Sequence, residues 1–279
     1  AYERYKAPRK GMHDELASQM PILKEVLAAL NIPMYELDGW EADDLIGTIS
    51  VKDTAAGWET VVVTGDKDSL QLVTETTTVK LVSTRMGRTA TRDMTPETFQ
   101  EEYGFGPIHI IDLKALMGDA SDNIPGVKGV GEKTAMALVQ RYGSIDLLYA
   151  AMPEIEMAAG TPAKPGVVKK LAEGEEMARM SYDLATIRTD APIEFTPEAN
   201  LRREPDRAAL YQLFLRLEFA KLIDKYGLTA PQGEGDTETA PVTGTCESEV
   251  VDSSARAWEL LELWRKAEWV DLLALPELD

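Results

Sequence analysis

The stretch Thr60-Val-Val-Val-Thr-Gly-Asp-Lys-Asp68 decides the fold class of this chain. Its first five residues form an unbroken β-branched run, which is typical of a buried strand paired in parallel with a neighbour. Strand and helix patterns alternate around this run through residue 85, so we predict an α/β domain. Ligands of open α/β sheets bind beyond the carboxyl ends of the strands, which is where Asp66 and Asp68 lie.

The elements around this strand follow from hydrophobic spacing and from helix start and stop signals. Apolar residues three and four positions apart predict a helix over residues 14–31, and Met34–Leu37 is predicted to be a short strand. A second helix begins at Trp40, with acids in its first turn. Leu81–Thr84 is predicted to be another strand, which ends in a turn at Arg85–Arg88. Further helices are predicted from Thr95 and over Ile111–Met117, Glu132–Tyr142 and Leu210–Tyr226.

Composition limits the class of protein. The chain has 279 residues, of which 44% are hydrophobic, so it can bury a core. It has no apolar run long enough to cross a bilayer and no secretory signal at its start, which predicts a soluble protein that is not secreted. A single cysteine fits a reducing cytoplasm. With one cysteine and two histidines a zinc site is not expected, and oxygen ligands favour Mg²⁺ or Mn²⁺.

The charge balance bears on nucleic acid as a partner. The chain carries 29 basic and 48 acidic residues, a net charge of −19, which by itself argues against binding to phosphates. Several of the acids, however, occur in short pairs and triplets, the arrangement that a metal site requires. The net charge therefore weakens the expectation of a nucleic-acid partner without excluding it.

Three short acidic clusters are candidates for a metal site. In Glu41-Ala-Asp-Asp44, complementation of a helix dipole is by itself the better explanation. Asp66 and Asp68 follow a strand, where metal binding and N-capping of a following helix are about equally expected. Asp119 and Asp122 are three apart in a turn of small polar residues, for which Asx-turn hydrogen bonding is the structural alternative.

A glycine-rich run, Ile124-Pro-Gly-Val-Lys-Gly-Val-Gly131, follows the third cluster at once. Its glycines allow a tight turn, and Gly131 opens a helix whose N-terminal amides can bind a phosphate. Two helices joined in this way form a helix-hairpin-helix type element, which grips a DNA backbone without reading its sequence. A Rossmann-type phosphate loop is the rival, but its spacing and preceding strand are absent. The residues expected to contact DNA here are Gly126, Lys128, Gly129, Gly131, Lys133 and Thr134.

Residues 1–11 are basic and contain Tyr5, Lys6, Arg9 and Lys10. Cations and an aromatic side chain in one short stretch suit contact with a nucleic-acid strand. For an isolated basic run, a solvated terminus would be the better explanation.

Phosphodiester hydrolysis is the chemistry that joins these pieces, because it needs a metal-activated water and stabilisation of a charged transition state. Two Mg²⁺ ions roughly 4 Å apart supply both, and holding them takes several carboxylates from more than one element. A Lys or Arg would then orient the scissile phosphate. The acids that meet this demand are Glu41, Asp43, Asp44, Asp66, Asp68, Asp119 and Asp122.

The motifs in their order resemble the 5′-nuclease domain of bacterial DNA polymerase I, which is a member of the flap-endonuclease family. The similarity covers residues 1–228 and rests on Tyr5–Arg9, Glu41–Asp44, Gly65–Asp68, Leu116–Ala135 and Leu184–Asp190. It implies a PIN-like (resolvase-like) α/β core with a parallel sheet, a helical arch and a helix–three-turn–helix subdomain. It also implies 5′→3′ exonuclease and 5′-flap endonuclease activity in Okazaki-primer removal and DNA repair.

By position, the resemblance implies a role for each candidate residue. The seven acids would hold two Mg²⁺ or Mn²⁺ ions, and Lys6 and Arg9 would be catalytic arch residues beside the scissile phosphate. Tyr5 and Lys10 would contact DNA, while the turn Gly126–Lys133 would grip the duplex and hold K⁺ through main-chain oxygens. The expected partner is flapped, nicked or branched DNA, bound by a monomer in the bacterial cytoplasm.

The resemblance also suggests how the chain is divided. Residues 1–110 would form the nuclease core with a remnant of the arch, and residues 111–228 the DNA-binding subdomain with the closing helices. Residues 229–245 have the composition of a linker. Residues 246–279, with a helix over Ala255–Ala267 and a strand at Trp269–Leu275, would begin a degenerate 3′→5′ exonuclease-like domain, because the catalytic Asp-x-Glu expected there is missing.

Both ends of the chain look cut. The family's first strands, with two acidic ligands, are expected upstream of Ala1, so the chain alone is expected to be weak or inactive. Two alternatives stay open. A free-standing 5′ nuclease is disfavoured by residues 229–279, and a DNA-binding module without activity is disfavoured by the retained acids.

Overall fold

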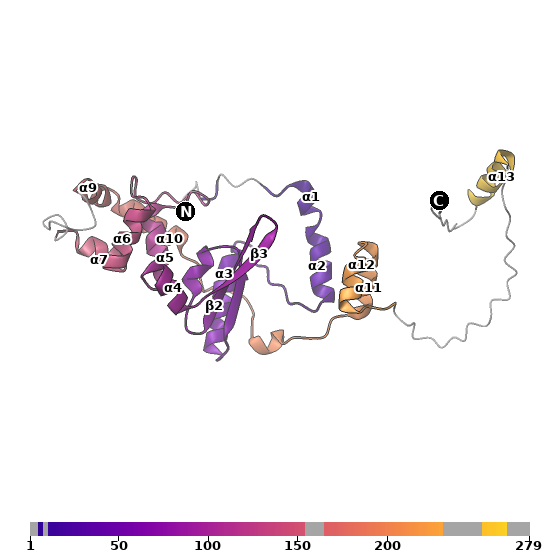
Figure 1. Cartoon of the computed structure of the whole chain (residues 1–279), viewed down its shortest axis with the longest axis horizontal. Helices are drawn as coiled ribbons and strands as arrows, with labels where there is room; N and C mark the ends of the chain where they lie inside the picture. The colour runs from indigo at the N-terminus through magenta and orange to yellow at the C-terminus, as the bar shows by residue number, and fades with distance from the viewer. Residues whose placement is uncertain (1–4, 8–10, 154–164, 231–252, 267–279) are drawn as a thin grey trace. The chain divides into compact units, whose positions relative to one another are not determined.

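The computed structural model describes residues 5–7, 11–153, 165–230 and 253–266 (Figure 1). The chain separates into two units, residues 1–230 and 231–279. In the second unit the described element is α13, Ser254–Trp264, a helix with exposed Trp258 and Trp264 that agrees with the predicted one. The strand expected at Trp269–Leu275 lies outside the described residues. None of the described helices is both long and apolar enough to cross a membrane.

The sheet of the first unit has three strands in the order β1 (Thr60–Thr64), β2 (Thr77–Arg85) and β3 (Arg88–Met94). As predicted, β1 pairs in parallel with its neighbour β2, while β2 and β3 are antiparallel. The register places Val62 opposite Val79, and Val79 opposite Met94. All three side chains are buried in the main core, so one face of the sheet is apolar and covered.

The other face of β1 differs from the prediction. Val61 and Val63 were expected to be buried, but 57% and 63% of their surfaces are exposed. Side chains alternate along a strand, so Val61 and Val63 point away from the face on which Val62 is buried, and their face of β1 is not covered by the described residues. In the described part of the chain, the β-branched run is therefore buried on one face alone.

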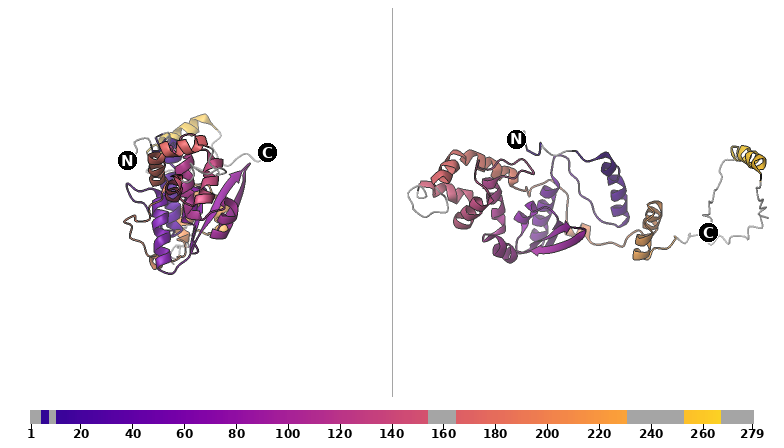
Figure 2. Two further views of the ribbon diagram at one scale, coloured as in Figure 1. Left: turned by 90° about the vertical axis from the view of Figure 1, so that its left-hand side faces the viewer. Right: turned by 45° about the horizontal axis from the view of Figure 1, so that its top comes forward.

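The predicted turn at Arg85–Arg88 joins β2 and β3 into a hairpin. Met86 and Gly87, its two central residues, both have positive φ, the conformation of the tight turns that match strand twist. Most side chains of β3 are exposed, and the left-hand view of Figure 2 shows the strands reaching out beyond the helices.

Helix α5 (Ile110–Met117) connects the sheet to a group of helices (Figure 1). Seven of its eight residues are buried, including the charged Asp112 and Lys114. It contacts η1, η2, α6, α7 and α10. The described helices of this unit between residues 42 and 185, apart from α5, are α3 (Ala42–Ala55), η1 (Asp68–Leu72), α4 (Pro96–Tyr103), η2 (Pro107–His109), α6 (Glu132–Tyr142), α7 (Ile145–Ala150), α9 (Pro165–Glu173) and α10 (Glu175–Ala185).

Two predicted long helices are each interrupted. The first is divided into α1 (Asp14–Ala17) and α2 (Met20–Ala29), because Pro21 cannot donate to a carbonyl of the preceding turn. The second is divided into α11 (Arg207–Arg216) and α12 (Ala220–Tyr226), because Glu218 between them has a left-handed φ of 57°. Helices α2 and α11 pack through a small apolar cluster of their own.

The strand predicted at Met34–Leu37 is wrong, because these residues have no regular structure. Their apolar side chains find partners in another way: Tyr35 and Leu37 pack around buried Leu45 and Ile193. A short 3-10 helix, η3 (Pro197–Asn200), follows the segment that contains Ile193. Packing onto this segment replaces the strand pairing that the sequence pattern suggested.

Candidate functional site

The loop after α5 is closed by its own backbone and presents Asp119 and Asp122. Asp119 and Ile124 exchange two backbone hydrogen bonds of 2.9 and 2.8 Å, and Val127 N–H donates to Leu116 O at 2.8 Å. Gly118 has a φ of 75°, and a Cβ there would lie 2.6 Å from the carbonyl oxygen of Ile124. The glycine therefore permits the close approach that fixes the loop.

The second acidic cluster forms the turn at the carboxyl end of β1. Asp66 N–H donates to Thr64 Oγ1 at 3.0 Å, and Asp68 N–H donates to Asp66 Oδ1 at 2.9 Å. Asp68 then begins the 3-10 helix η1. One oxygen of Asp66 therefore stabilises the turn by accepting this hydrogen bond. The carboxylate of Asp68 points toward α5.

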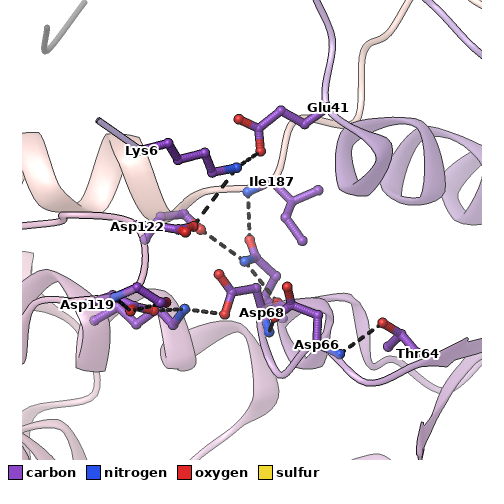
Figure 3. A network of polar contacts seen from close by, with 12 residues as sticks. Lys6, Glu41, Thr64, Asp66, Asp68, Asp119, Asp122 and Ile187 are labelled. Atoms are coloured by element: carbon purple, nitrogen blue, oxygen red, sulfur yellow. Dashed lines mark hydrogen bonds and ion pairs between the residues drawn. The ribbon is translucent and has the colours of Figure 1, made fainter. Parts of the chain in front are cut away.

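Lys114 joins these two clusters. Its ammonium group donates to Asp119 Oδ2 at 2.7 Å and also to Asp68 Oδ1, so it lies between carboxylates from separate segments. Figure 3 labels these two acids, Asp68 and Asp119. Only 7% of the Lys114 surface is exposed. A buried ammonium ion is costly unless it is paired, and here two carboxylates compensate its charge.

The electrostatics of this bridge are those of a buried, compensated cation. Burial opposes the charged form of Lys114, but its hydrogen bonds to Asp119 and Asp68 outweigh that effect and raise its pKa. For Asp119, burial is likewise outweighed by the hydrogen bonds from Lys114 and Ser121, which lower the pKa of the carboxyl to about 2. For Asp68, burial prevails and raises the pKa.

Lys6 makes a second bridge of the same kind. Its ammonium group contacts Glu41 Oε2 and lies 3.9 Å from Asp122 Oδ2 (Figure 3). The Lys6 backbone N–H also donates to Asp122 O at 2.9 Å. The half-buried Tyr5 ring lies 4.9 Å from the Lys6 nitrogen. Burial lowers the Lys6 pKa, but the hydrogen bonds to Glu41 and Tyr5 raise it by more.

The three acids at the start of α3 have different surroundings. Glu41 is the N-cap residue and faces Lys6. Asp43 has a pKa raised by burial and then by the nearby charges of Asp66 and Asp68, so it belongs to the same electrostatic cluster. Both oxygens of Asp44 accept backbone hydrogen bonds, at 3.2 Å from Glu41 N–H and at 2.9 Å from Arg188 N–H.

Residues 185–191 form a strap that ties α3 to η1. Buried Gln71 donates to Asp68 O at 3.1 Å and to Ala185 O at 3.0 Å, and its Oε1 accepts from Ile187 N–H at 2.8 Å. At the far end of the strap, Ala191 N–H donates to Thr48 Oγ1 at 3.0 Å. The strap therefore fixes the first acidic cluster relative to the second.

Sequence reasoning missed Lys114 and Gln71. One signal could have revealed Lys114: a charged residue within a helix of otherwise apolar character, a few positions before Asp119. Gln71 carries no such signal, because the two partners through which it holds the strap are 114 and 116 residues away in the chain.

The acids therefore lie in one region, where two lysine side chains bridge them in pairs. Among the described residues, no three carboxylate, histidine or cysteine side chains lie close enough together to hold a metal ion as they stand. Instead, each ammonium group occupies the space between two carboxylates. The predicted residues Arg9 and Lys10 lie outside the described part of the chain.

The glycine turn presents a second, basic surface. Lys128 and Lys133 are exposed at the start of α6, whose N-cap residue Gly131 provides no side-chain cap. Gly129 has a φ of 81°, and its carbonyl oxygen accepts a hydrogen bond of 3.3 Å from Lys170 Nζ. A helix N-terminus with lysines beside it is suited to a phosphate group.

Two family models match the chain in succession. The N-terminal resolvase-like domain of 5′-3′ exonucleases matches residues 1–104. The C-terminal domain of 5′-3′ exonucleases, a SAM fold, matches residues 105–208. The two matches adjoin and together cover most of the first unit.

Relatives with high identity are much longer than this chain. It is 42% identical over 235 residues to DNA polymerase I of Bacillus subtilis, a match that covers 84% of the chain and 26% of that protein. It is 38% identical over 276 residues to DNA polymerase I of Pseudomonas aeruginosa, covering 98% of the chain and 29% of that protein. The chain therefore spans less than a third of either relative.

Solved structures resemble the fold at lower identity. The T5 5′-exonuclease with bound divalent zinc ions is 21% identical with a TM-score of 0.51, over 77% of this chain and 73% of that one. The catalytic core of Rad2 in complex with a DNA substrate is 17% identical with a TM-score of 0.51, over 78% and 72%. With the family matches, these likenesses confirm the predicted fold class, a resolvase-like core followed by a helical domain.

Proposed function

Because the chain belongs to the 5′-3′ exonuclease family, we propose that it is a structure-specific 5′ nuclease that hydrolyses DNA phosphodiesters as an exonuclease and a 5′-flap endonuclease. The observation that carries the proposal is the convergence of three acidic segments on Lys6 and Lys114. So many carboxylates beside one another would hinder simple DNA binding, but they suit a metal-dependent reaction on a phosphate.

The donor set fits hard divalent cations, because all of its members are carboxylate oxygens. When bound, two Mg²⁺ or Mn²⁺ ions supply an activated water and neutralise charge on the phosphate. We assign Asp44 to holding α3 and the strap in place, since both of its oxygens accept backbone hydrogen bonds. The acids that would hold the metals are Glu41, Asp43, Asp66, Asp68, Asp119 and Asp122.

Basic residues would position the DNA. Lys6, with Arg9, would orient the scissile phosphate, and Tyr5 and Lys10 would contact the strand beside it. The turn Gly126–Lys133, with Thr134, would grip the duplex through backbone amides and lysines. We also propose K⁺ at main-chain oxygens of this turn, where an ammonium group already contacts Gly129 O.

The relatives suggest a wider setting. We propose that the chain is the nuclease part of a bacterial DNA polymerase I, acting as a monomer in the cytoplasm on flapped or nicked DNA during primer removal and repair. In it, residues 1–110 are the nuclease core, 111–228 the DNA-binding part and 229–245 a linker. Residues 246–279 then begin a degenerate exonuclease-like domain.

Replacement of Asp119 by Asn tests the proposal. In the complete gene product with Mg²⁺, we expect Asp119→Asn to slow cleavage of a labelled 5′-flap substrate by about 100-fold or more, because several kcal/mol of transition-state stabilisation depend on the metals. Asp93→Asn on the exposed hairpin is the matched control and should cleave normally. Cleavage by Asp119→Asn at the rate of the unmodified protein would contradict the assignment of Asp119. If the unmodified protein binds the flap substrate but does not cleave it, a DNA-binding module is favoured instead.

A further inference from the structure

We propose that Lys6 and Lys114 are internal counter-ions which compete with divalent metal for the carboxylates of this site. Each ammonium group bridges two acids from different segments of the chain. The inference rests on the proposed function, and it concerns how divalent metal ions gain access to the carboxylates. It predicts that metal binding to the DNA-free chain is weakened by these two lysines.

The Lys114 bridge gives the stronger evidence. Its nitrogen is within hydrogen-bonding distance of Asp68 and Asp119, which belong to η1 and to the loop after α5. The side chain is buried, so bulk water contributes little to compensation of the two carboxylates. Without the ammonium group, Asp68 and Asp119 would be two negative charges facing each other, which is the arrangement that attracts a divalent cation.

Lys6 has the same relation to the other acids. It contacts Glu41 at the start of α3 and approaches Asp122 in the loop, so it too joins two segments. Its side chain is more exposed than that of Lys114. A phosphate group in solvent can therefore reach the Lys6 ammonium and pair with it. Within the described residues, Lys114 is too buried for a phosphate group to reach its ammonium in the same way.

Competition follows from charge and from shared ligands. An ammonium hydrogen bond and a metal bond use the same carboxylate lone pairs, and a monovalent cation close to a divalent one repels it. The described carboxylates do not close into groups of three as they stand. Departure or displacement of an ammonium group would let the paired acids turn toward a common ion.

The experiment measures metal binding directly, without DNA. The variants are Lys6→Met and Lys114→Met, which remove the charge and retain most of the side-chain volume. Lys80→Met is the matched control, because Lys80 pairs with Asp93 on the exposed hairpin. Mn²⁺ affinity of the complete gene product and of its variants is measured by titration calorimetry and by the EPR signal of free Mn²⁺, at about pH 8, where carboxyl groups are ionised.

We expect each test variant to bind Mn²⁺ about tenfold more tightly or better than the unmodified chain, and Lys80→Met to bind as the unmodified chain does. Unchanged or weaker affinity in both test variants would overturn the inference. If the unmodified chain and all variants bind no Mn²⁺, the proposed metal site itself fails, which is a separate result.

Loss of the buried cation could also impair folding, so thermal unfolding is measured with chelator and with Mn²⁺. A Lys114→Met chain that unfolds early in chelator and gains more in Tm from Mn²⁺ than the unmodified chain supports the inference. An equal or smaller gain contradicts it. If Lys114→Met does not fold under either condition, the affinity of Lys6→Met alone decides the outcome, because that lysine lies outside the buried core.

Discussion

Gly118 and Gly126 face each other across the loop that carries Asp119 and Asp122. Both have positive φ, and a Cβ on Gly126 would overlap the backbone nitrogen of Gly118. The buried Ser181 hydroxyl accepts from Gly126 N–H at 3.0 Å and holds this approach. At the scale of single residues, the geometry of the third acidic cluster therefore depends on having glycine, which carries no Cβ, at both positions.

Alanine at Gly126 should accordingly destabilise the chain by at least about 2 kcal/mol, since both the steric overlap and the left-handed φ oppose it. Gly166→Ala is the matched control, because that glycine lies in α9 with open space around its Cβ position and no positive φ. It should change stability by no more than about 1 kcal/mol, and in the favourable direction. Urea unfolding compares the two, and equal midpoints would contradict the prediction.

Asp119 gives a prediction about acid stability. Because its folded-state pKa is lowered to about 2, its ionised form stabilises the fold above its ordinary pKa. That contribution is lost as the pH falls from about 4 toward 2. Thermal unfolding in chelator should therefore show a steeper loss of Tm over this range for the unmodified chain than for Asp119→Asn. The exposed Glu36→Gln is the control, and identical slopes for all three chains would refute the role of Asp119.

The three acids at the start of α3 show what residue patterns can and cannot predict. Their residue pattern alone favoured complementation of the helix dipole, and a place near the site was implied by the family resemblance. Their individual directions were not predictable. Asp43 lies near the second cluster while Asp44 is held by Arg188 N–H, a contact that is set by a partner 144 residues away.

For strand β1, the predicted strand was correct but the predicted burial of both faces was wrong. A β-branched run predicts a strand because such side chains fit a pleated surface, and the strand is there. The run does not reveal which face is covered, since that depends on neighbouring elements. Helix breaks are equally hard to read: the interruption at Glu218 lies within a continuous apolar period.

Threonine substitutions on β1 test this burial pattern while keeping the β-branched shape. Val62→Thr should destabilise the chain by about 1–3 kcal/mol, because it buries a hydroxyl group in the apolar core. Val61→Thr on the exposed face should alter stability by less than about 0.5 kcal/mol. Denaturant unfolding of the two variants is the measurement. A large loss for Val61→Thr would mean that this face is covered.

For the whole molecule, the net charge of −19 requires that any DNA affinity come from local basic surfaces. The fold class was predictable from alternating strands and helices. It was also predictable that acids from distant segments would come together in one site. The contacts that complete the site were not predictable, since Lys114 and Asp68 are 46 residues apart and no local pattern predicts that they pair.

Salt dependence tests the basic surface at the start of α6. If Lys133 contacts a phosphate, Lys133→Ala should weaken DNA binding and reduce the slope of log affinity against log salt by about 0.9. Fluorescence anisotropy with a labelled flap substrate, in the absence of cleavage, measures the slope. Lys24→Ala is the control, because Lys24 lies in α2, away from α6 in the sequence, and already pairs with Glu36. The assignment is wrong if both variants retain the slope of the unmodified chain.

The strap of residues 185–191 has a consequence for local unfolding. The amide hydrogens of Ile187, Arg188 and Ala191 are donated to side chains of Gln71, Asp44 and Thr48, which belong to two other elements. Opening the strap breaks all three at once and releases the tie between the first two acidic clusters. The exchange rates of these three amides in deuterated water should therefore rise and fall together, and their common opening free energy sets the fraction of molecules in which the acids keep their arrangement.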